Sequence, residues 1–153
     1  LLIIGLMFIG GSSGSTAGGI KTSTLMILLL AVYGMIKGKK NIELFKRTIP
    51  YELLDTAYAI FLFAVLILFI STFLLSILEP KMNLTEIAFE VVSAFNTVGL
   101  SAGITPHLSS AGKFLITLTM FIGRVGILTI FFAMSTRVIS TQYKYPKTSF
   151  LVG

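Results

Sequence analysis

The sequence predicts an all-α membrane protein, and three observations indicate this fold class. Of the 153 residues, 55% are hydrophobic and 12% are charged, whereas about a quarter of a soluble domain is charged. Two stretches, 56–78 and 114–136, are apolar and long enough to cross the roughly 30 Å hydrocarbon core as helices. A further apolar region, 1–36, is interrupted by a segment rich in glycine. Lipid must therefore cover part of the apolar surface.

Residues 1–36 predict a transmembrane helix that is broken in its middle. The apolar segments 1–9 and 25–36 are separated by a run of Gly, Ser, Thr and Ala, which a lipid-facing helix would not contain. One straight helix over the whole region would be roughly 54 Å long, far more than the bilayer core. Such a run is tolerated at membrane depth where protein buries it or water reaches it. The alternative is a close crossing of two helices through small residues.

A basic linker, 37–50, follows the broken helix and precedes the span 56–78. Lys and Arg are concentrated in this linker and after the last span, which indicates that both regions face the cytoplasm. The cations concerned are Lys37, Lys39, Lys40, Lys46, Arg47, Arg137, Lys144 and Lys147. We therefore expect the C-terminal tail, 138–153, in the cytoplasm.

Residues 84–95 predict a short amphipathic helix that enters the membrane without crossing it, because it is too short to span. Asn83 is the expected N-cap, with Glu86 as its partner in a capping box. Glu86 and Glu90 lie four residues apart and share one helix face. They either raise the local cation concentration or belong to an ordinary solvated face. The helix and the extended segment 96–101 after it form a re-entrant structure.

The segment 96–101 contains the sequence Thr97, Val98, Gly99 between the short helix and the last span. This context is typical of segments whose backbone carbonyls replace the hydration shell of a cation. Gly99 can adopt backbone angles that other residues avoid. The alternative interpretation is a capped turn that joins two helices.

Two cations lie near or within the expected membrane core. Arg124 is at the centre of the span 114–136, where an arginine costs a few kcal/mol and should face a cavity, a bundle interior or a partner. Arg124 would repel ions in a cation pathway, and the alternative is a buried pair with an acidic residue. Lys21 follows the glycine-rich run. It is either a second charge that, like Arg124, opposes the passage of cations, or a lysine that reaches the membrane interface.

Two enzyme-like patterns in the glycine-rich run are set aside. Residues 10–14 fit a G-x-S-x-G elbow, but the required strand, histidine and acid are missing around them. Residues 14–22 approach a phosphate-binding loop, yet Ile20 separates the second glycine from the lysine. We therefore expect no enzyme activity and no bound cofactor. The net charge of +6 is not clustered with aromatic residues, which argues against a nucleic acid partner.

The sequence resembles the Ktr/Trk/HKT superfamily of potassium transport proteins. Four stretches carry this resemblance: Met-Phe-Ile-Gly-Gly-Ser-Ser-Gly-Ser-Thr-Ala-Gly-Gly-Ile-Lys-Thr, Ser-Ala-Phe-Asn-Thr-Val-Gly-Leu-Ser, Gly-Ile-Thr-Pro and Met-Phe-Ile-Gly-Arg-Val-Gly. It covers nearly the whole chain and is to the C-terminal portion of a bacterial Ktr-type membrane subunit. In that family one polypeptide contains four potassium-channel-like units of outer helix, re-entrant pore helix, filter and inner helix.

The resemblance implies that residues 1–36 are the broken inner helix of the third unit, with an intramembrane loop at 10–21. Residues 51–137 would be the complete fourth unit, with its outer helix at 56–78, pore helix at 84–95, filter at 96–101 and inner helix at 114–136. The implied filter residues are Asn96, Thr97, Val98, Gly99, Leu100 and Ser101, with the carbonyls of Thr97, Val98 and Gly99 on potassium. The implied gate residues are Gly10, Gly11, Ser12, Ser13, Gly14, Ser15, Thr16, Ala17, Gly18, Gly19, Lys21 and Arg124.

The resemblance further implies a function and a set of partners. The function is potassium ion uptake across the bacterial plasma membrane, with sodium as a second candidate ion. The implied partners are membrane lipid, the missing N-terminal half of the same polypeptide, a second copy in a homodimer, and a cytosolic nucleotide-binding regulatory ring. Three alternatives are a tetrameric cation channel with one unit in each chain, a non-conducting membrane scaffold and an intramembrane hydrolase.

Overall fold

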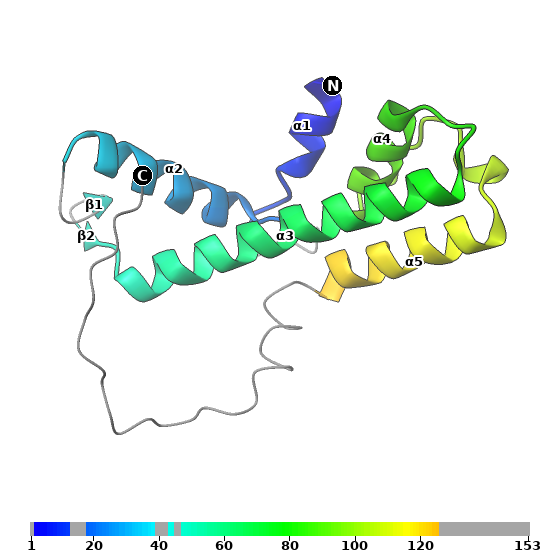
Figure 1. The fold of residues 1–153 in the computed structure, drawn as a ribbon. Coiled ribbons are helices and arrows are strands. Elements are labelled where there is room, and N and C mark those ends of the chain that lie inside the picture. Colours follow the sequence, from blue (N-terminus) through cyan, green and yellow to red (C-terminus); the bar gives the residue numbers. More distant parts are fainter. Residues whose placement is uncertain (1, 13–17, 39–42, 45–46, 126–153) are drawn as a thin grey trace, which may run out of the picture.

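The computed structural model describes residues 2–12, 18–38, 43–44 and 47–125 (Figure 1). Its helices are α1 (Leu2–Phe8), α2 (Thr22–Ile36), α3 (Tyr51–Leu78), α4 (Leu84–Phe95) and α5 (Ser110–Val125), with a 3-10 turn η1 (Thr105–His107). The strands β1 (Glu43–Leu44) and β2 (Arg47–Thr48) form a short antiparallel pair in the basic linker, which the sequence does not predict. Part of the expected loop, 13–17, the end of the last span, 126–136, and the tail, 138–153, lie outside the described residues.

The long helix α3 and the helix α5 lie side by side in opposite directions, and α4 packs against both of them (Figure 1). The helix α3 begins at Tyr51, before the expected start at Thr56, with Pro50 at its N-cap position. Proline is compatible with this end of a helix, where its missing N–H costs no hydrogen bond. The expected outer span is therefore only part of a longer helix.

The helix α5 begins at Ser110, four residues before the expected start of the last span at Phe114. Ser109 accounts for this earlier start, because its side-chain oxygen accepts the backbone N–H of Gly112 at 3.1 Å. This contact satisfies a donor that would otherwise be unpaired in the first turn.

The short helix α4 has the residue range in which the sequence predicts an amphipathic helix, but its N-terminus differs from the prediction. Asn83 makes no side-chain capping hydrogen bond, so the predicted capping box is wrong. Its amide Nδ2 instead donates to the Glu86 carboxylate at 3.3 Å. The carboxylate attracts the amide donor more strongly than a neutral acceptor would, and the two side chains satisfy each other away from the backbone.

One stripe of α3 forms the centre of the core, since its buried residues recur every three or four positions. These are Leu54, Ala57, Ala64, Leu68, Ser71 and Leu75, with a single longer step of seven positions between Ala57 and Ala64. Phe95 at the end of α4 is fully buried against the same cluster. The side chain of Thr119 on α5 is also buried, and its Oγ1 lies 3.2 Å from Ser71 Oγ, so α3 and α5 meet through small polar side chains as well as apolar ones.

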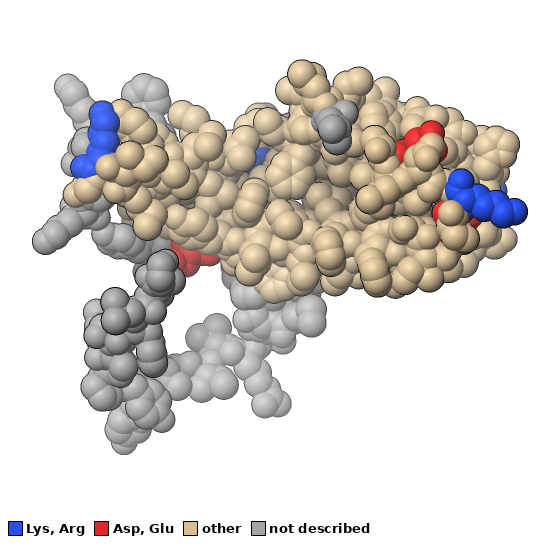
Figure 2. Space-filling model, turned by 45° about the horizontal axis from the view of Figure 1, so that its top comes forward, with Lys and Arg blue, Asp and Glu red and all other residues tan. Residues whose placement is uncertain are grey.

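The remaining faces of α3 expose large apolar side chains. Phe69, Leu62 and Phe73 are 71%, 69% and 58% exposed, and the segment Leu53–Leu78 is long and apolar enough to cross a membrane. Figure 2 shows Lys, Arg, Asp and Glu mostly at the two ends of the elongated body, with an almost uncharged surface between them. An apolar surface of this extent requires lipid or further protein to cover it.

The polar end of α3 is joined to the start of α5 by Glu79. Its carboxylate Oε1 accepts the backbone N–H of Ser109 at 2.6 Å. Hydrogen bonds from the side chain and backbone of Ser109 lower the pKa of Glu79 from its ordinary value of 4.5. The ionised carboxylate therefore stabilises the junction between the two helices.

Candidate functional site

The glycine-rich run between α1 and α2 leaves the helical path and returns to the same place. Gly10 donates its N–H to Ile20 O at 2.9 Å, and Thr22 donates its N–H to Gly11 O at 3.2 Å. Ile9 and Ile20 form a parallel bridge. Because the bridged segments run in the same direction, the chain continues onward after the run instead of turning back. Within the described residues, α1 thus ends at Phe8 and α2 begins at Thr22, and residues 9–12 and 18–21 between them are not helical.

The end of this run lies against the end of α4 and against α5. Gly18 donates its N–H to Thr97 Oγ1 at 3.1 Å, and Gly19 donates its N–H to Gly123 O at 3.3 Å. Three segments that are far apart in the sequence, around residues 18, 97 and 123, therefore meet at one point. The structure brings together the predicted loop and the start of the predicted filter segment.

Glycine is required at this meeting point because the backbones touch. A Cβ on Gly18 would lie 3.0 Å from Phe95 O and 3.1 Å from Gly123 O. A Cβ on Gly123 would overlap with Phe95 O, and one on Gly19 would overlap with Asn96 Oδ1. Gly19 also has a φ of +74°, which other residues rarely adopt.

The segment 96–101 starts with a buried residue and continues as an exposed chain. Asn96 is 3% exposed, and its amide Nδ2 donates to Val92 O at 3.0 Å. Thr97 has a φ of +53° and Gly99 a φ of +81°. A left-handed threonine is rare and costs about 1–3 kcal/mol, so its contact with Gly18 helps to hold this conformation.

The backbone N–H and carbonyl groups of this segment differ in their hydrogen bonds. The N–H groups of Thr97 and Val98 donate back to Ala94 O and Ser93 O at 3.1 and 3.0 Å. Within the described ranges, the carbonyl oxygens of Thr97, Val98 and Gly99 accept no hydrogen bond. Backbone carbonyls without an internal partner are suited to replace the water around a dehydrated cation.

A cavity of about 490 Å³ separates α1 from this segment. The first residues of the loop, Gly10 and Gly11, line it together with Thr97 and Val98. Leu100, which is 51% exposed, also lines it. The glycine-rich loop and the segment 96–101 thus line the same cavity.

The two predicted gate cations are in different positions relative to this space. Arg124 directly follows Gly123 in α5, at the point where the backbone touches Gly19. Lys21 occupies the N-cap position of α2, at the base of the loop. Ser12 is within the described part of the chain, and the gate residues Ser13, Gly14, Ser15, Thr16 and Ala17 lie outside it.

The two glutamates of α4 have different environments. Glu86 is partly exposed and bonded to Asn83, whereas Glu90 is only 5% exposed. The interpretation of both as one solvated face is therefore wrong for Glu90. Ser101 Oγ donates to its Oε1 at 2.7 Å, and Thr105 Oγ1 donates to the same oxygen.

Sequence reasoning missed two residues that contribute to the site, Gly123 and Ser93, and it noted Glu90 without its contacts to Ser101 and Thr105. Ser93 Oγ donates to Leu100 O at 2.5 Å. One signal for Gly123 was available, because a glycine inside a spanning helix next to an arginine indicates a close backbone approach. The roles of Glu90 and Ser93 depend on the folding of 100–105 back onto α4, which no local pattern indicates.

The helical fold and the apolar exposed surface define a class, that of α-helical membrane proteins. Comparison with known families agrees with this class: the TrkH family, described as a cation transport protein, matches residues 1–144. The chain belongs to this cation transport protein family.

Individual relatives match the chain over almost its full length. It is 45% identical to the potassium/sodium uptake protein NtpJ of Enterococcus hirae, over 100% of this chain and 35% of the relative. It is 44% identical to the Ktr system potassium uptake protein D of Bacillus subtilis, over 99% of this chain and 33% of the relative. It is 26% identical to the Trk system potassium uptake protein TrkH of Escherichia coli, over 85% of this chain and 29% of the relative. The chain spans about a third of the length of these relatives.

Proposed function

We propose that this chain is part of a Ktr-type transporter that takes up potassium through a filter-lined pore gated by an intramembrane loop. One observation carries the proposal. The carbonyls of Thr97, Val98 and Gly99 accept no hydrogen bond from the described residues, and the segment 96–101 lies directly against the glycine-rich loop. The names of the relatives, potassium/sodium uptake and Ktr system potassium uptake, support potassium as the main ion and sodium as a second one.

In this proposal the filter is the segment from Asn96 to Ser101, and potassium binds to the carbonyls of Thr97, Val98 and Gly99. The left-handed angles at Thr97 and Gly99 support it, because consecutive carbonyls can point to one side only when the backbone departs from a regular strand. One segment cannot surround an ion, so three further segments must come from the rest of the protein.

The gate is the loop 10–21 together with Arg124. The hydrogen bond from Gly18 to Thr97 and the contact of Gly19 with Gly123 support a resting loop that lies beside the filter, at the level of Arg124. A positive charge at that level raises the energy of a passing cation. The small residues of the loop leave few side-chain contacts to break when it moves.

The architecture follows from these roles. Residues 1–36 are the broken inner helix of a third unit, and 51–137 are a complete fourth unit, with α3 as outer helix, α4 as pore helix and α5 as the start of the inner helix. The linker 37–50 and the tail 138–153 face the cytoplasm. The chain crosses the plasma membrane more than once.

The partners follow from the size of the relatives and from their names. Because the chain matches about a third of each relative, we assign the remaining units to another part of the same polypeptide. This size difference favours a multi-unit polypeptide over a tetramer of one-unit chains. Names that include Ktr and Trk systems support further subunits, which we propose to be a second copy in a homodimer and a cytosolic nucleotide-binding ring.

The experiment that tests this function is potassium uptake in a potassium-transport-deficient bacterium that carries the full-length gene containing this sequence. Gly99→Ser introduces a side chain at a φ of +81° and should remove the preference for potassium over sodium. Arg124→Ala should raise potassium uptake by about tenfold, since loss of a nearby positive charge lowers the barrier by on the order of 1 kcal/mol.

Matched variants separate these effects from general damage. Gly38→Ser places the same side chain at a similar φ of +64° with open space around it, away from the filter, and should leave ion preference unchanged. Arg124→Lys keeps the charge and should keep the wild-type rate. Equal uptake by wild type, Gly99→Ser and Arg124→Ala would remove both residues from the ion pathway and favour the non-conducting scaffold.

A further inference from the structure

Glu90 is a buried acidic side chain that the proposed ion pathway does not use directly. Charged side chains are rarely buried to this degree unless they are paired, and an unpaired buried charge is costly. Glu90 is 5% exposed, and within the described residues its carboxylate accepts hydrogen bonds from two hydroxyl groups. The position therefore needs a reason beyond the packing of α4.

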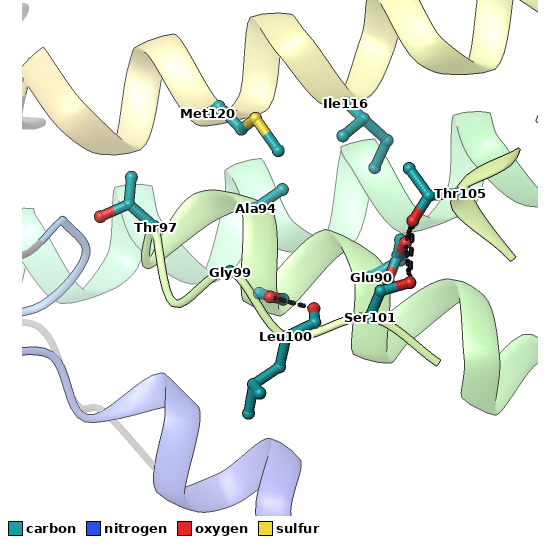
Figure 3. A pocket seen from close by; sticks show the side chains of 10 residues that line it. Glu90, Ala94, Thr97, Gly99, Leu100, Ser101, Thr105, Ile116 and Met120 are labelled. Atoms are coloured by element: carbon teal, nitrogen blue, oxygen red, sulfur yellow. Dashed lines mark hydrogen bonds between the residues drawn. The ribbon is translucent and has the colours of Figure 1, made fainter. Parts of the chain in front are cut away.

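The contacts of Glu90 fold the chain after the proposed filter back onto α4 (Figure 3). Its Oε1 accepts from Ser101 Oγ at 2.7 Å and from Thr105 Oγ1. The two hydroxyl oxygens are 2.8 Å apart, and Gly103 donates its N–H to Ser101 Oγ at 3.0 Å. Hydrogen bonds to an ionised carboxylate are roughly twice as strong as those between neutral groups.

A second side chain on the same helix holds the preceding residue. Ser93 Oγ donates to Leu100 O at 2.5 Å, so α4 holds Leu100 through Ser93 and Ser101 through Glu90. In contrast, the carbonyls of Thr97, Val98 and Gly99 have no hydrogen bond from the described residues. Within the described residues, side chains of α4 therefore hold Leu100 and Ser101, while the carbonyls of Thr97, Val98 and Gly99 accept no hydrogen bond.

A cavity of about 420 Å³ lies at the same place. Glu90, Thr97, Gly99 and Ser101 line one side of it, and Ile116 and Met120 of α5 line the other (Figure 3). Glu90 Oε2 is buried, and within the described part of the chain it has no hydrogen-bond partner. The wall of this cavity is mostly apolar, so the hydroxyl groups of Ser101 and Thr105 remain the described partners of the Glu90 carboxylate.

We propose that Glu90 is a positioning residue for ion selectivity, which fixes the filter segment through Ser101 and Thr105. This inference rests on the proposed role of 96–101 as a potassium filter. Carbonyls that are free to move adjust to sodium as well as to potassium, so the restraint from Glu90 preserves the spacing that favours the larger ion.

The test is competition between rubidium, as a tracer for potassium, and sodium in cells that carry the full-length protein. Glu90→Gln keeps the size of the side chain but removes its charge, and should reduce the preference for rubidium by about tenfold, the cost of one weakened charge-assisted hydrogen bond. Glu86→Gln makes the same change of charge on the same helix and should leave the preference unchanged. Equal losses in both variants would overturn positioning and indicate attraction by charge at the mouth.

A second pair of variants tests the same contact without altering Glu90. Thr105→Val removes the donor with little change of shape and should lower the preference as Glu90→Gln does, whereas Thr105→Ser should restore it. The double variant Glu90→Gln/Thr105→Val should be no worse than the stronger single variant, because both changes remove one interaction. If Glu90→Gln is absent from the membrane, Thr105→Val decides, and a wild-type preference in that variant overturns the inference.

The outcomes also separate this inference from the proposed function. A wild-type protein that takes up no potassium would contradict the function itself. A wild-type protein that takes up potassium, with normal preference in both Glu90→Gln and Thr105→Val, would contradict the positioning role alone.

Discussion

At the scale of single residues, the site depends on three glycines that serve different purposes. Gly19 combines a φ of +74° with a side-chain neighbour, Asn96, that leaves no room for a Cβ. Gly99 has a φ of +81° but open space around it, so its requirement is conformational. Gly123 has an ordinary helical position, and its requirement is the close approach of Phe95 O. Of these three positions, only Gly123 requires glycine for packing alone.

Gly123→Ala should destabilise the protein by about 1–3 kcal/mol, the usual cost of forcing extra volume into a packed contact. The new Cβ would push the end of α4 away from α5 and disturb the position of Gly19. The measurement is the unfolding temperature of the full-length protein in detergent. Gly5→Ala is the matched control, because α1 leaves open space around Gly5. A common unfolding temperature for the two variants would show that the contact at Gly123 can relax without cost.

The sequence indicates the composition of the site at this scale but not its geometry. Thr97, Val98 and Gly99 are recognisable as a candidate filter from their order and context. The left-handed φ of Thr97 is not, since a β-branched residue disfavours it. The contact that accompanies it comes from Gly18, 79 residues away, and a contact at such a distance leaves no local pattern.

At the scale of secondary structure, hydrophobic patterning predicts which segments are helical, and polar contacts determine where they end. The short helix agrees with its predicted range because its apolar positions follow a helical period from Leu84 to Phe95. The start of α5 differs because Ser109 caps it with a side-chain oxygen. The prediction of a capping box at Asn83 is wrong for the same reason. The amide group of asparagine both donates and accepts hydrogen bonds, so it has several possible partners nearby, and the sequence does not show which one it binds.

The junction between α3 and α5 should depend on pH through Glu79. Its pKa is lowered in the folded protein, so the ionised form is the one that stabilises the fold. The contribution is fully present above the ordinary value of 4.5 and is lost as the pH falls through the lowered, folded-state value. Unfolding temperatures measured from neutral to acidic pH should therefore fall more steeply for the wild type than for Glu79→Gln. Parallel curves would show that the contact with Ser109 adds nothing in solution.

At the scale of the whole molecule, the described residues have too little interior for their apolar content. The stripe of α3 that faces α4 and α5 is buried, while Phe69 and Leu62 on its other faces are more than two-thirds exposed. The composition predicts this property, because few charges are available to cover the surface. The composition does not indicate which faces meet lipid and which meet other protein, since both environments favour the same residues.

Phe69→Lys distinguishes a membrane surface from a water-exposed one. In water this exposed position would accept a lysine with little cost, whereas at the centre of a spanning helix it costs about 3 kcal/mol. The amount of full-length protein in the membrane fraction should therefore fall strongly. Ile36→Lys is the control, because Ile36 is 79% exposed at the end of α2 beside Lys37 and should tolerate the charge. Equal amounts of both variants would contradict a lipid environment for this face.

Backbone contacts join the two ends of the glycine-rich loop, so the positions of α1 and α2 need not depend on the length of the loop. Ile9 and Ile20 are bridged, and Gly10 donates its N–H to Ile20 O, so the two ends of the loop are joined to each other. Doubling the length of such a closed loop costs only about 0.6 kcal/mol in entropy. Insertions and deletions inside the loop can therefore change the size of the proposed gate while α1 and α2 keep their register, so this gate could evolve independently of the helices that carry it.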